Sequence, residues 1–233
     1  PAGVREHFDA GIGARGALAR RRWEERLTAY REKYPHLAPQ IGPMQRRELP
    51  DGWDRDLPSF PADPKGLAGR DASGQALNAL ARHVPWLLGG SADLGPSTRT
   101  TLEFPGAGEF EADSPDGRNL HFGVREHAMA AIVNGLSLSK LRPFGSTFVI
   151  FSDYARPAIR LAALMELPVI FVLTHDAMGD GEDGPTHQPV EQLVSLRAIP
   201  GLVVLRPADA NEVVEAYRLV MPLRHEPAVL ALS

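Results

Sequence analysis

Short apolar segments alternate with amphipathic segments from residue 71 onward, and this alternation restricts the possible folds more than any other feature. The periodicity predicts helices over 72–84, 125–140, 152–166, 190–197 and 208–221, and strands over 143–148, 169–174, 202–205 and 228–232. A further apolar run at 86–89 precedes a stretch, 90–118, that we expect to be loop. Strands that are apolar throughout are buried on both faces. The sequence therefore predicts an α/β fold, with a mainly parallel, twisted sheet and helices on both faces.

Residues 1–60 follow a different pattern, which predicts two parts, 1–60 and 61–233. Apolar side chains recur at helical spacing within an otherwise charged segment, 15–34: Leu18, Trp23, Leu27 and Tyr30. Pro35 and Pro39 are expected to end this helix, and further prolines continue to residue 64 without any period. We interpret residues 1–60 as a linker with one amphipathic helix, and 61–233 as the domain.

Composition excludes several classes of protein. The chain has no cysteine, so disulfides, thiolate metal sites and a cysteine nucleophile are excluded. A net charge of −4 argues against a nucleic-acid partner. No apolar window approaches the roughly 18 residues of a membrane span, and the first residues do not resemble a signal peptide. We therefore expect a cytoplasmic protein without a nucleic-acid or membrane partner.

Two glycine motifs in the segment GDGEDG at 179–184 suggest phosphate or metal binding, and both interpretations fail. As a dinucleotide loop, the segment would repel a pyrophosphate through three carboxylates: Asp180, Glu182 and Asp183. The same glycines resemble the start of a metal-binding motif of thiamin enzymes, which ends in an asparagine about thirty residues later, and Asn211 lies at about that distance. We instead expect Asn211 to be the N-cap of the following helix, and we predict no metal site in this chain.

The segment from Thr174 to Glu191 combines two histidines and several carboxylates directly after a predicted strand, where open α/β sheets carry their sites. Together with GRDAS at 69–73, GSADLGPS at 90–97, FGVREH at 122–127 and STFVIF at 146–151, this segment resembles the transketolase family. The resemblance covers about residues 65–233. Departures from the family pattern are Asp180, in place of an apolar residue, and the pair Phe144 and Gly145.

The resemblance implies the pyrimidine-binding (Pyr) domain of an enzyme that uses thiamin diphosphate. Such an enzyme moves a two-carbon ketol unit from a ketose phosphate to an aldose phosphate. In the family, a separate upstream domain binds the diphosphate and Mg²⁺, and the Pyr domain faces the diphosphate-binding domain of a partner subunit. We therefore expect a homodimeric full-length enzyme and an inactive isolated chain.

Five residues match family positions around the cofactor: Asp93, Glu126, Phe148, Phe151 and Tyr154. The resemblance implies that Glu126 contacts the aminopyrimidine ring and assists proton transfer there. The three aromatic residues match the pocket of that ring, and Asp93 a position near the cofactor. Local structure offers alternatives: Glu126 as an exposed residue complementing a helix dipole, the aromatic residues as core, and Asp93 as a turn residue.

The resemblance also implies a substrate site made of Arg70, Ser97, His175, Asp183 and His187. Arg70, Ser97 and His175 match phosphate ligands, and arginine suits this role because its planar group donates two parallel hydrogen bonds. His187 matches a residue that contacts the ketol hydroxyls and assists proton transfer. Asp183 matches the carboxylate that distinguishes the configuration of the sugar at C2. We therefore assign Glu126, His175 and His187 as the catalytic candidates.

Two alternatives remain open from the sequence. One is the Pyr domain of the related 1-deoxyxylulose-5-phosphate synthase, which shares a DGPTHQ-type loop; the residues 189–191 and 197–200 favour transketolase. The other is a non-catalytic Pyr-like subunit of a thiamin enzyme whose domains are separate chains.

Overall fold

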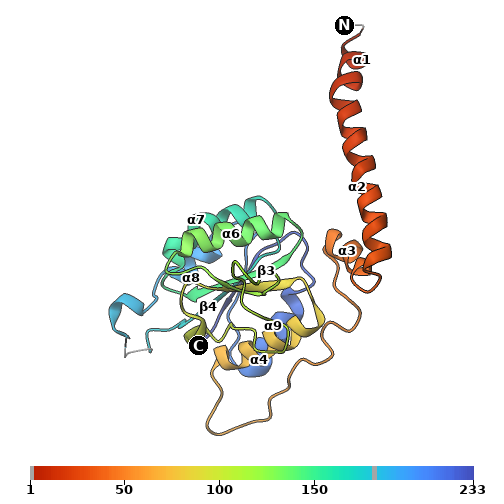
Figure 1. Ribbon diagram of the computed structural model, residues 1–233. Coiled ribbons are helices and arrows are strands. Elements are labelled where there is room, and N and C mark those ends of the chain that lie inside the picture. Colours follow the sequence, from red (N-terminus) through yellow and green to blue (C-terminus); the bar gives the residue numbers. More distant parts are fainter. Residues whose placement is uncertain (1–2, 180–182) are drawn as a thin grey trace. The chain divides into compact units, whose positions relative to one another are not determined.

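The computed structural model describes residues 3–179 and 183–233, which form two compact units divided between Arg46 and Arg47. The first unit contains only helical elements: α1 (Val4–Phe8), a π-helical turn (Asp9–Gly13), α2 (Ala14–Lys33) and α3 (Ala38–Gln45) (Figure 1). The predicted helix 15–34 is confirmed as α2. None of the residues of α2 is buried, so its apolar stripe is not covered within this unit.

Helix α3 corrects the prediction of an unstructured proline-rich segment after residue 39. Pro39 lies in the first turn of α3, where the missing N–H would have no helical partner in any case. Pro43 lies within the same short helix. The first helix does end before Pro35 as predicted, but Pro39 lies in a second helix, because proline is compatible with a helical first turn.

The second unit is built around parallel strands, which confirms the predicted α/β class. Its elements, in chain order, are α4 (Gly69–His83), β1 (Leu87–Ser91), α5 (Gly95–Thr98), β2 (Asn119–His121), α6 (Glu126–Leu138), β3 (Arg142–Phe148), α7 (Ser152–Leu164), β4 (Ile170–Thr174), η3 (Pro185–His187), α8 (Gln192–Arg197), β5 (Val203–Leu205), α9 (Ala210–Val220) and β6 (Ala228–Ala231). In the described chain these strands pair in the order β2-β1-β3-β4-β6-β5, with every pair parallel.

Helices cover both faces of this sheet. Figure 1 shows α6 and α7 side by side on one face, and α4 and α9 side by side on the other. Buried apolar side chains fill the layer beneath α6 and α7, including Met129, Ile159 and Phe171. Tyr217 of α9 is fully buried, and its hydroxyl lies 2.8 Å from that of Ser73 on α4. Burying one large apolar side chain contributes about 1.5–3 kcal/mol, so this packing holds the sheet and its helices together.

Strand β1 lies unusually close to its neighbours. A Cβ added to Gly89 would lie 2.0 Å from the carbonyl oxygen of Phe144, and one added to Gly90 would lie 1.8 Å from that of Leu120. Only glycine fits at both positions. This is why the sequence shows only a short apolar run at 86–89 where the structure has a five-residue strand.

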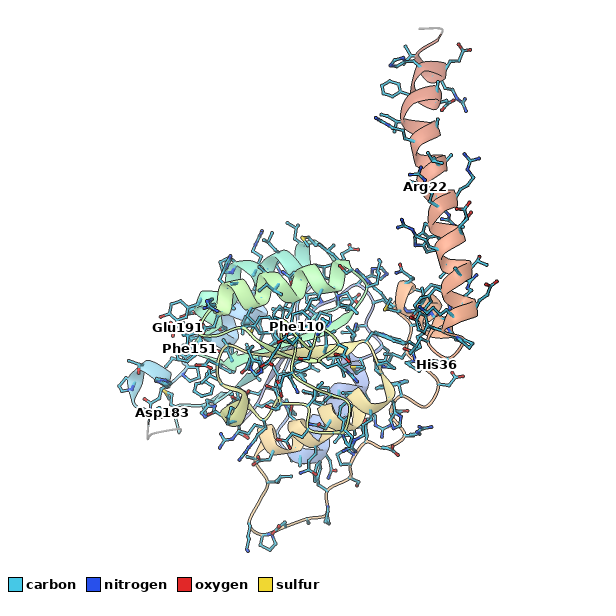
Figure 2. All side chains as sticks on the ribbon, viewed as in Figure 1. Arg22, His36, Phe110, Phe151, Asp183 and Glu191 are labelled. Carbon is cyan, nitrogen blue, oxygen red and sulfur yellow. The ribbon has the colours of Figure 1, made fainter. Side chains whose placement is uncertain are left out.

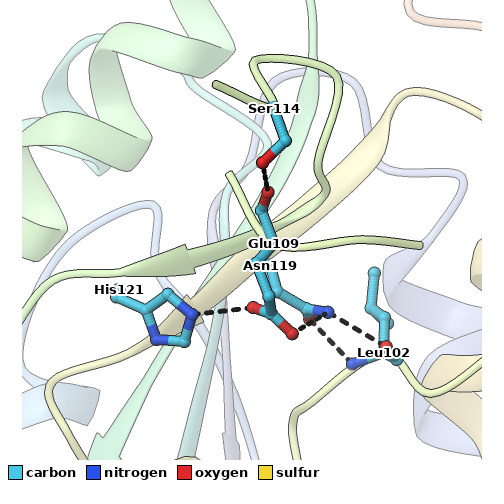
Figure 3. Close-up of polar contacts among 5 residues, drawn as sticks. All are labelled: Leu102, Glu109, Ser114, Asn119 and His121. Atoms are coloured by element: carbon cyan, nitrogen blue, oxygen red, sulfur yellow. Dashed lines mark hydrogen bonds and ion pairs between the residues drawn. The ribbon is translucent and has the colours of Figure 1, made fainter. Parts of the chain in front are cut away.

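The sequence pattern did not predict strand β2. Side-chain hydrogen bonds connect this strand to the long loop before it (Figure 3). The amide of Asn119 accepts from the N–H of Leu102 and donates to its carbonyl oxygen, at 2.8 and 3.0 Å. Glu109 bonds to the ring of His121 at 2.7 Å, and its carbonyl oxygen accepts from Ser114. The expected loop 90–118 also contains the single helical turn α5. A three-residue strand has too little period to be found from the sequence.

The expected N-cap of α9 was wrong by two residues. Asp209 is the N-cap, and its carboxylate accepts from the N–H of Glu212 at 2.9 Å. Asn211 instead makes two hydrogen bonds to the backbone of Phe60, at 2.9 and 3.0 Å. These bonds attach the proline-rich segment to α9. Asp and Asn are nearly equivalent as N-caps, so local sequence could not decide between them.

Candidate active site

The predicted site residues follow the carboxyl ends of four parallel strands, which meet at one edge of the sheet. Asp93 and Ser97 follow β1, and Glu126 begins the helix after β2. Phe148 ends β3, Phe151 is the N-cap of the following helix α7, and His175 follows β4. Arg70 lies in the first turn of α4, and its N–H donates to the carbonyl oxygen of Ser233, two residues after the end of β6. Segments far apart in sequence are thereby brought to the same edge.

Glu126 is a buried carboxylate at the start of a helix. It is the first residue of α6 and is 8% exposed. The hydroxyl of Thr147 on β3 donates to its carboxylate at 3.4 Å. The helix N-terminus favours a negative charge at this position. The sequence allowed an exposed glutamate that only complements the dipole, but the observed residue is withdrawn from solvent and faces β3.

Four rings form one cluster near the ends of β3 and β4: those of Phe148, Phe151, His175 and His187. Phe148 stacks on Phe151 with centroids 5.7 Å apart and planes 12° apart. The ring of His175 lies 3.7 Å from that of Phe148. His187 meets the edges of both phenylalanines, at 6.0 and 5.2 Å. Tyr154 lies 6.2 Å from Phe151 and is 65% exposed. The structure therefore joins residues predicted for the cofactor to residues predicted for the substrate.

The backbone at His175 adopts an uncommon conformation. Its φ is 58°, in the left-handed region that non-glycine residues seldom occupy. The hydroxyl of Thr174 lies 2.9 Å from its Nδ1 atom. The next residue, Asp176, is buried and pairs with Arg206 at 2.5 Å. No sequence motif marks this pair; the one available signal is that Arg206 directly follows the predicted strand 202–205 and so belongs to the same edge of the sheet.

Asp183 lies on the outer part of the loop between β4 and α8, where its side chain is exposed (Figure 2). His187 follows within the turn η3, and its Nδ1 atom lies 2.8 Å from the hydroxyl of Thr186. Asp180 and Glu182 lie outside the described residues. The family departure at Phe144 lies inside the sheet, since this residue is fully buried beside Gly89.

Asp93 and Ser97 lie on the turn between β1 and the long loop. Asp93 is exposed, has a φ of 65° typical of a turn, and lines a cavity of about 240 Å³ together with His121. A buried network of hydroxyl groups attaches this turn to β3: Thr98, Thr100 and Ser146, at 2.6–3.1 Å.

A buried cation, Arg142, lies at the opposite, amino edge of the sheet. Arg142 begins β3 and donates to the carbonyl oxygens of Val220 and Leu223, at the end of α9. Burial, together with the nearby charge of Arg47, lowers the pKa of Arg142 to about 9. These contacts stabilise the end of a helix and are separate from the predicted site.

Neither a metal cluster nor a membrane span is found in the part of the chain that the structure describes. No three His, Asp or Glu side chains within 3–179 and 183–233 are arranged to hold a metal ion. Over the same residues, no helix is both long enough and apolar enough to cross a bilayer.

Fold and site define an α/β domain that presents a buried carboxylate, stacked aromatic rings and two imidazoles at the carboxyl edge of a parallel sheet. Residues 65–233 match the family described as the transketolase pyrimidine-binding domain. The chain therefore belongs to the transketolase family. It is 52% identical to the transketolase of Geobacillus stearothermophilus, over its whole length and 35% of that protein. The chain thus spans about a third of that relative.

Two solved structures extend the comparison. A transketolase from Pichia stipitis in complex with sedoheptulose-7-phosphate has a TM-score of 0.90 and 40% identity, covering all of this chain and 35% of that chain. A split-gene transketolase, described as an inactive β4 tetramer, has a TM-score of 0.57 and 30% identity, covering 72% of this chain and 51% of that chain.

Proposed function

We propose that this chain is the central part of a transketolase, which transfers a two-carbon ketol unit from a ketose phosphate to an aldose phosphate. The observation that carries the proposal is the four-ring cluster at the ends of β3 and β4, together with the buried carboxylate of Glu126 against β3, in a chain that belongs to this family. We further propose that residues 1–60 are the interdomain linker and 61–233 the pyrimidine-binding domain.

The residues present fit the aminopyrimidine ring of thiamin diphosphate. Phe148 and Phe151 offer nearly parallel rings that suit a flat heterocycle, and Glu126 offers a desolvated carboxylate that suits a ring nitrogen. When bound, the cofactor supplies the thiazolium carbon that accepts the two-carbon unit. Glu126 would hold a proton at the ring nitrogen, the phenylalanines would orient the ring, and Asp93 and Tyr154 would border it. Mg²⁺ and the diphosphate belong to the other domain in this proposal.

Substrate contacts are assigned to the loop after β4 and to two more distant residues. His187 would contact the ketol hydroxyls and transfer a proton, since imidazole both donates and accepts near neutral pH. Asp183 would distinguish the configuration of the sugar at C2. His175, Arg70 and Ser97 would bind phosphate. The Pichia stipitis relative, solved with a sugar phosphate, supports this substrate class.

We propose a homodimeric, cytoplasmic enzyme of the pentose phosphate pathway. The outer face of α6 supports a protein partner: it carries no Asp, Glu, Lys or Arg after Glu126, and Ile132 and Leu138 are 47% and 56% exposed. Exposed apolar surface of this kind favours an interface. The diphosphate-binding domain of a partner subunit is the proposed occupant of the site edge.

The test is ketol transfer by the full-length protein. With thiamin diphosphate and Mg²⁺, we expect it to convert xylulose-5-phosphate and ribose-5-phosphate to products. The isolated chain should give no product above a Glu126→Gln control. Absence of transfer by the full-length protein, or turnover by the isolated chain, would contradict the proposal.

A split subunit is the second candidate, because the inactive split-gene tetramer is similar to this chain. An upstream reading frame that is continuous with this sequence would favour one polypeptide, and a start codon near Pro1 would favour a separate subunit. Assaying the full-length protein with pyruvate tests the remaining alternative, 1-deoxyxylulose-5-phosphate synthase.

A further inference from the structure

Arg206 and Asp176 form an ion pair beside the proposed substrate loop, and none of the roles assigned above uses it. The Nε atom of Arg206 lies 2.5 Å from the carboxylate of Asp176. Arg206 directly follows β5, whereas Asp176 follows β4, and β6 lies between these two strands. The arginine side chain therefore reaches across the carboxyl end of β6 to meet the aspartate.

Asp176 depends on this contact. Its side chain is 7% exposed, so the carboxylate has lost most of its hydration, whereas the side chain of Arg206 is 45% exposed. A buried carboxylate is tolerated only when a counter-charge or hydrogen-bond donors replace water. Within residues 3–179 and 183–233, Arg206 is the cation paired with it. Asp176 thus ties its own stretch of backbone to the end of β5.

The residue that precedes Asp176 is held in a strained conformation. His175 has a φ of 58°, and a left-handed non-glycine residue persists only where its surroundings determine it from several sides. On one side, His175 is continuous with β4, and the hydroxyl of Thr174 lies 2.9 Å from its ring. Its imidazole packs on Phe148 at 3.7 Å. The ion pair of Asp176 fixes the other side.

Beyond Asp176 the chain makes few contacts. The backbone N–H groups of residues 177–179 donate to no other backbone group of the described chain. Met178 is 63% exposed, and its carbonyl oxygen accepts from the side chain of Gln188 at 3.1 Å. The ion pair is therefore the last firm attachment before the projecting part of the loop.

We propose that Arg206 is a positioning residue: through Asp176 it holds His175 in its left-handed conformation, and so sets where the imidazole meets the donor sugar phosphate. This inference rests on the proposed function and assigns Arg206 no contact with substrate or cofactor. Loss of the ion pair should release the backbone at 175–176 and weaken donor binding. The pyrimidine pocket around Glu126 and Phe151 should be unaffected.

Three variants of the full-length enzyme separate positioning from stability. Arg206→Met leaves Asp176 buried without its cation, so we expect a lower Tm and a KM for the ketose phosphate raised by about 10- to 100-fold. Asp176→Asn combined with Arg206→Met removes the unpaired charge, so the Tm should recover while the KM stays high. Recovery of the KM together with the Tm would overturn the proposal, because the pair would then be purely structural. Arg197→Met, an exposed arginine at the end of α8, is the matched control and should behave as wild type.

A double-mutant cycle tests whether the effect passes through His175. In a His175→Ala background, Arg206→Met should raise the KM by less than about twofold. If Arg206→Met raised the KM in that background by the same factor as in the wild-type background, the coupling through His175 would be refuted. Thiamin diphosphate affinity should be the same in all of these variants, and a parallel loss of cofactor affinity would also refute it.

Hydrogen exchange provides a readout that does not require activity. In the full-length Asp176→Asn, Arg206→Met double variant, the buried amide of Val149, which donates to the carbonyl oxygen of Thr174 at 2.8 Å, should exchange faster than in wild type. Unchanged exchange would overturn the inference whatever the kinetics show. If wild-type enzyme transferred no ketol unit, the proposed function would be wrong, while the exchange result would still decide whether the ion pair holds this segment.

Discussion

The imidazole of His175 lies over the ring of Phe148, with centroids 3.7 Å apart and planes inclined by 32°. One aromatic side chain therefore contacts both a proposed substrate ligand and, through its stacking on Phe151, the proposed pyrimidine pocket. A change in the position of this ring should consequently affect two binding events at once.

Phe148→Leu tests this shared role. We expect both the thiamin diphosphate affinity and the donor affinity of the full-length enzyme to fall, each by about 1 kcal/mol, which is the range of a lost aromatic contact. Cofactor titration and the KM for the ketose phosphate measure the two effects. Phe110→Leu, at a half-exposed position on the long loop, is the control and should leave both unchanged. A lower Tm with both affinities intact would show that Phe148 serves only as core.

Glu126→Gln keeps the shape of the side chain and removes its charge and basicity. Because proton transfer at the aminopyrimidine is proposed to need the carboxylate, kcat should fall by about 10²- to 10⁴-fold. The Tm should change little, since Thr147 can donate to the amide oxygen as it does to the carboxylate. Glu111→Gln, an exposed isosteric change, should keep full activity. A kcat within a few-fold of wild type would remove Glu126 from the mechanism.

Gly135 tests whether a partner covers the outer face of α6. A Cβ at this position would meet nothing within 4 Å, so Gly135→Ala should stabilise the isolated chain by about 0.5–1 kcal/mol in denaturant unfolding. Gly135→Glu should be tolerated in the same chain. In the full-length protein, however, the glutamate should shift the proposed homodimer towards monomer in analytical ultracentrifugation. An unchanged dimer would place the interface elsewhere.

Alkaline stability should depend on Tyr217. Burial raises the pKa of Tyr217 well above its ordinary value of 10.0, and the hydrogen bond to Ser73 opposes this effect. Above pH 10 the unfolded chain loses the phenolic proton while the folded chain keeps it. Tyr217 therefore lowers the free energy of unfolding as the pH rises, by up to about 1.4 kcal/mol per pH unit.

Tyr217→Phe should remove this contribution, as measured by chemical unfolding between pH 9 and 11. Arg142 acts in the opposite direction, because its pKa of about 9 in the folded chain lies below the ordinary value of 12.5. The slope of the unfolding free energy against pH must therefore be compared between wild type and Tyr217→Phe. Tyr154→Phe, at an exposed tyrosine, should leave the wild-type slope in place. Equal slopes for wild type and Tyr217→Phe would contradict the prediction.

Most helices and strands could be predicted because their periodicity is local. The apolar strand at 170–174 and the amphipathic helix at 210–220 each reveal their burial within one segment. Strand β2 and the short helix α3 could not be predicted in this way. The first exists because Asn119 and His121 bind a loop that is distant in sequence, and the second because proline is tolerated in a first helical turn.

The candidate site also contains some residues that the sequence could identify and some contacts that it could not. Glu126, His175 and His187 could be selected because they lie in motifs of an established family and directly after or near predicted strands. The pairing of Asp176 with Arg206, and the hydroxyl network around Ser146, join segments some thirty to fifty residues apart. Nothing local marks such partners, since each residue type is also common on surfaces.

The sequence by itself determined the α/β class, the family and the residue types available for chemistry. The alternation of apolar segments and the motifs are local patterns, so each can be recognised within one short segment of the chain. The tertiary structure alone decided which of those residues meet. Parallel strands align their carboxyl ends, and that alignment brings His175 onto Phe148, buries Glu126 against β3, and lets Arg206 reach Asp176 across β6. Long-range strand order, which no local pattern encodes, is the physical reason for the difference.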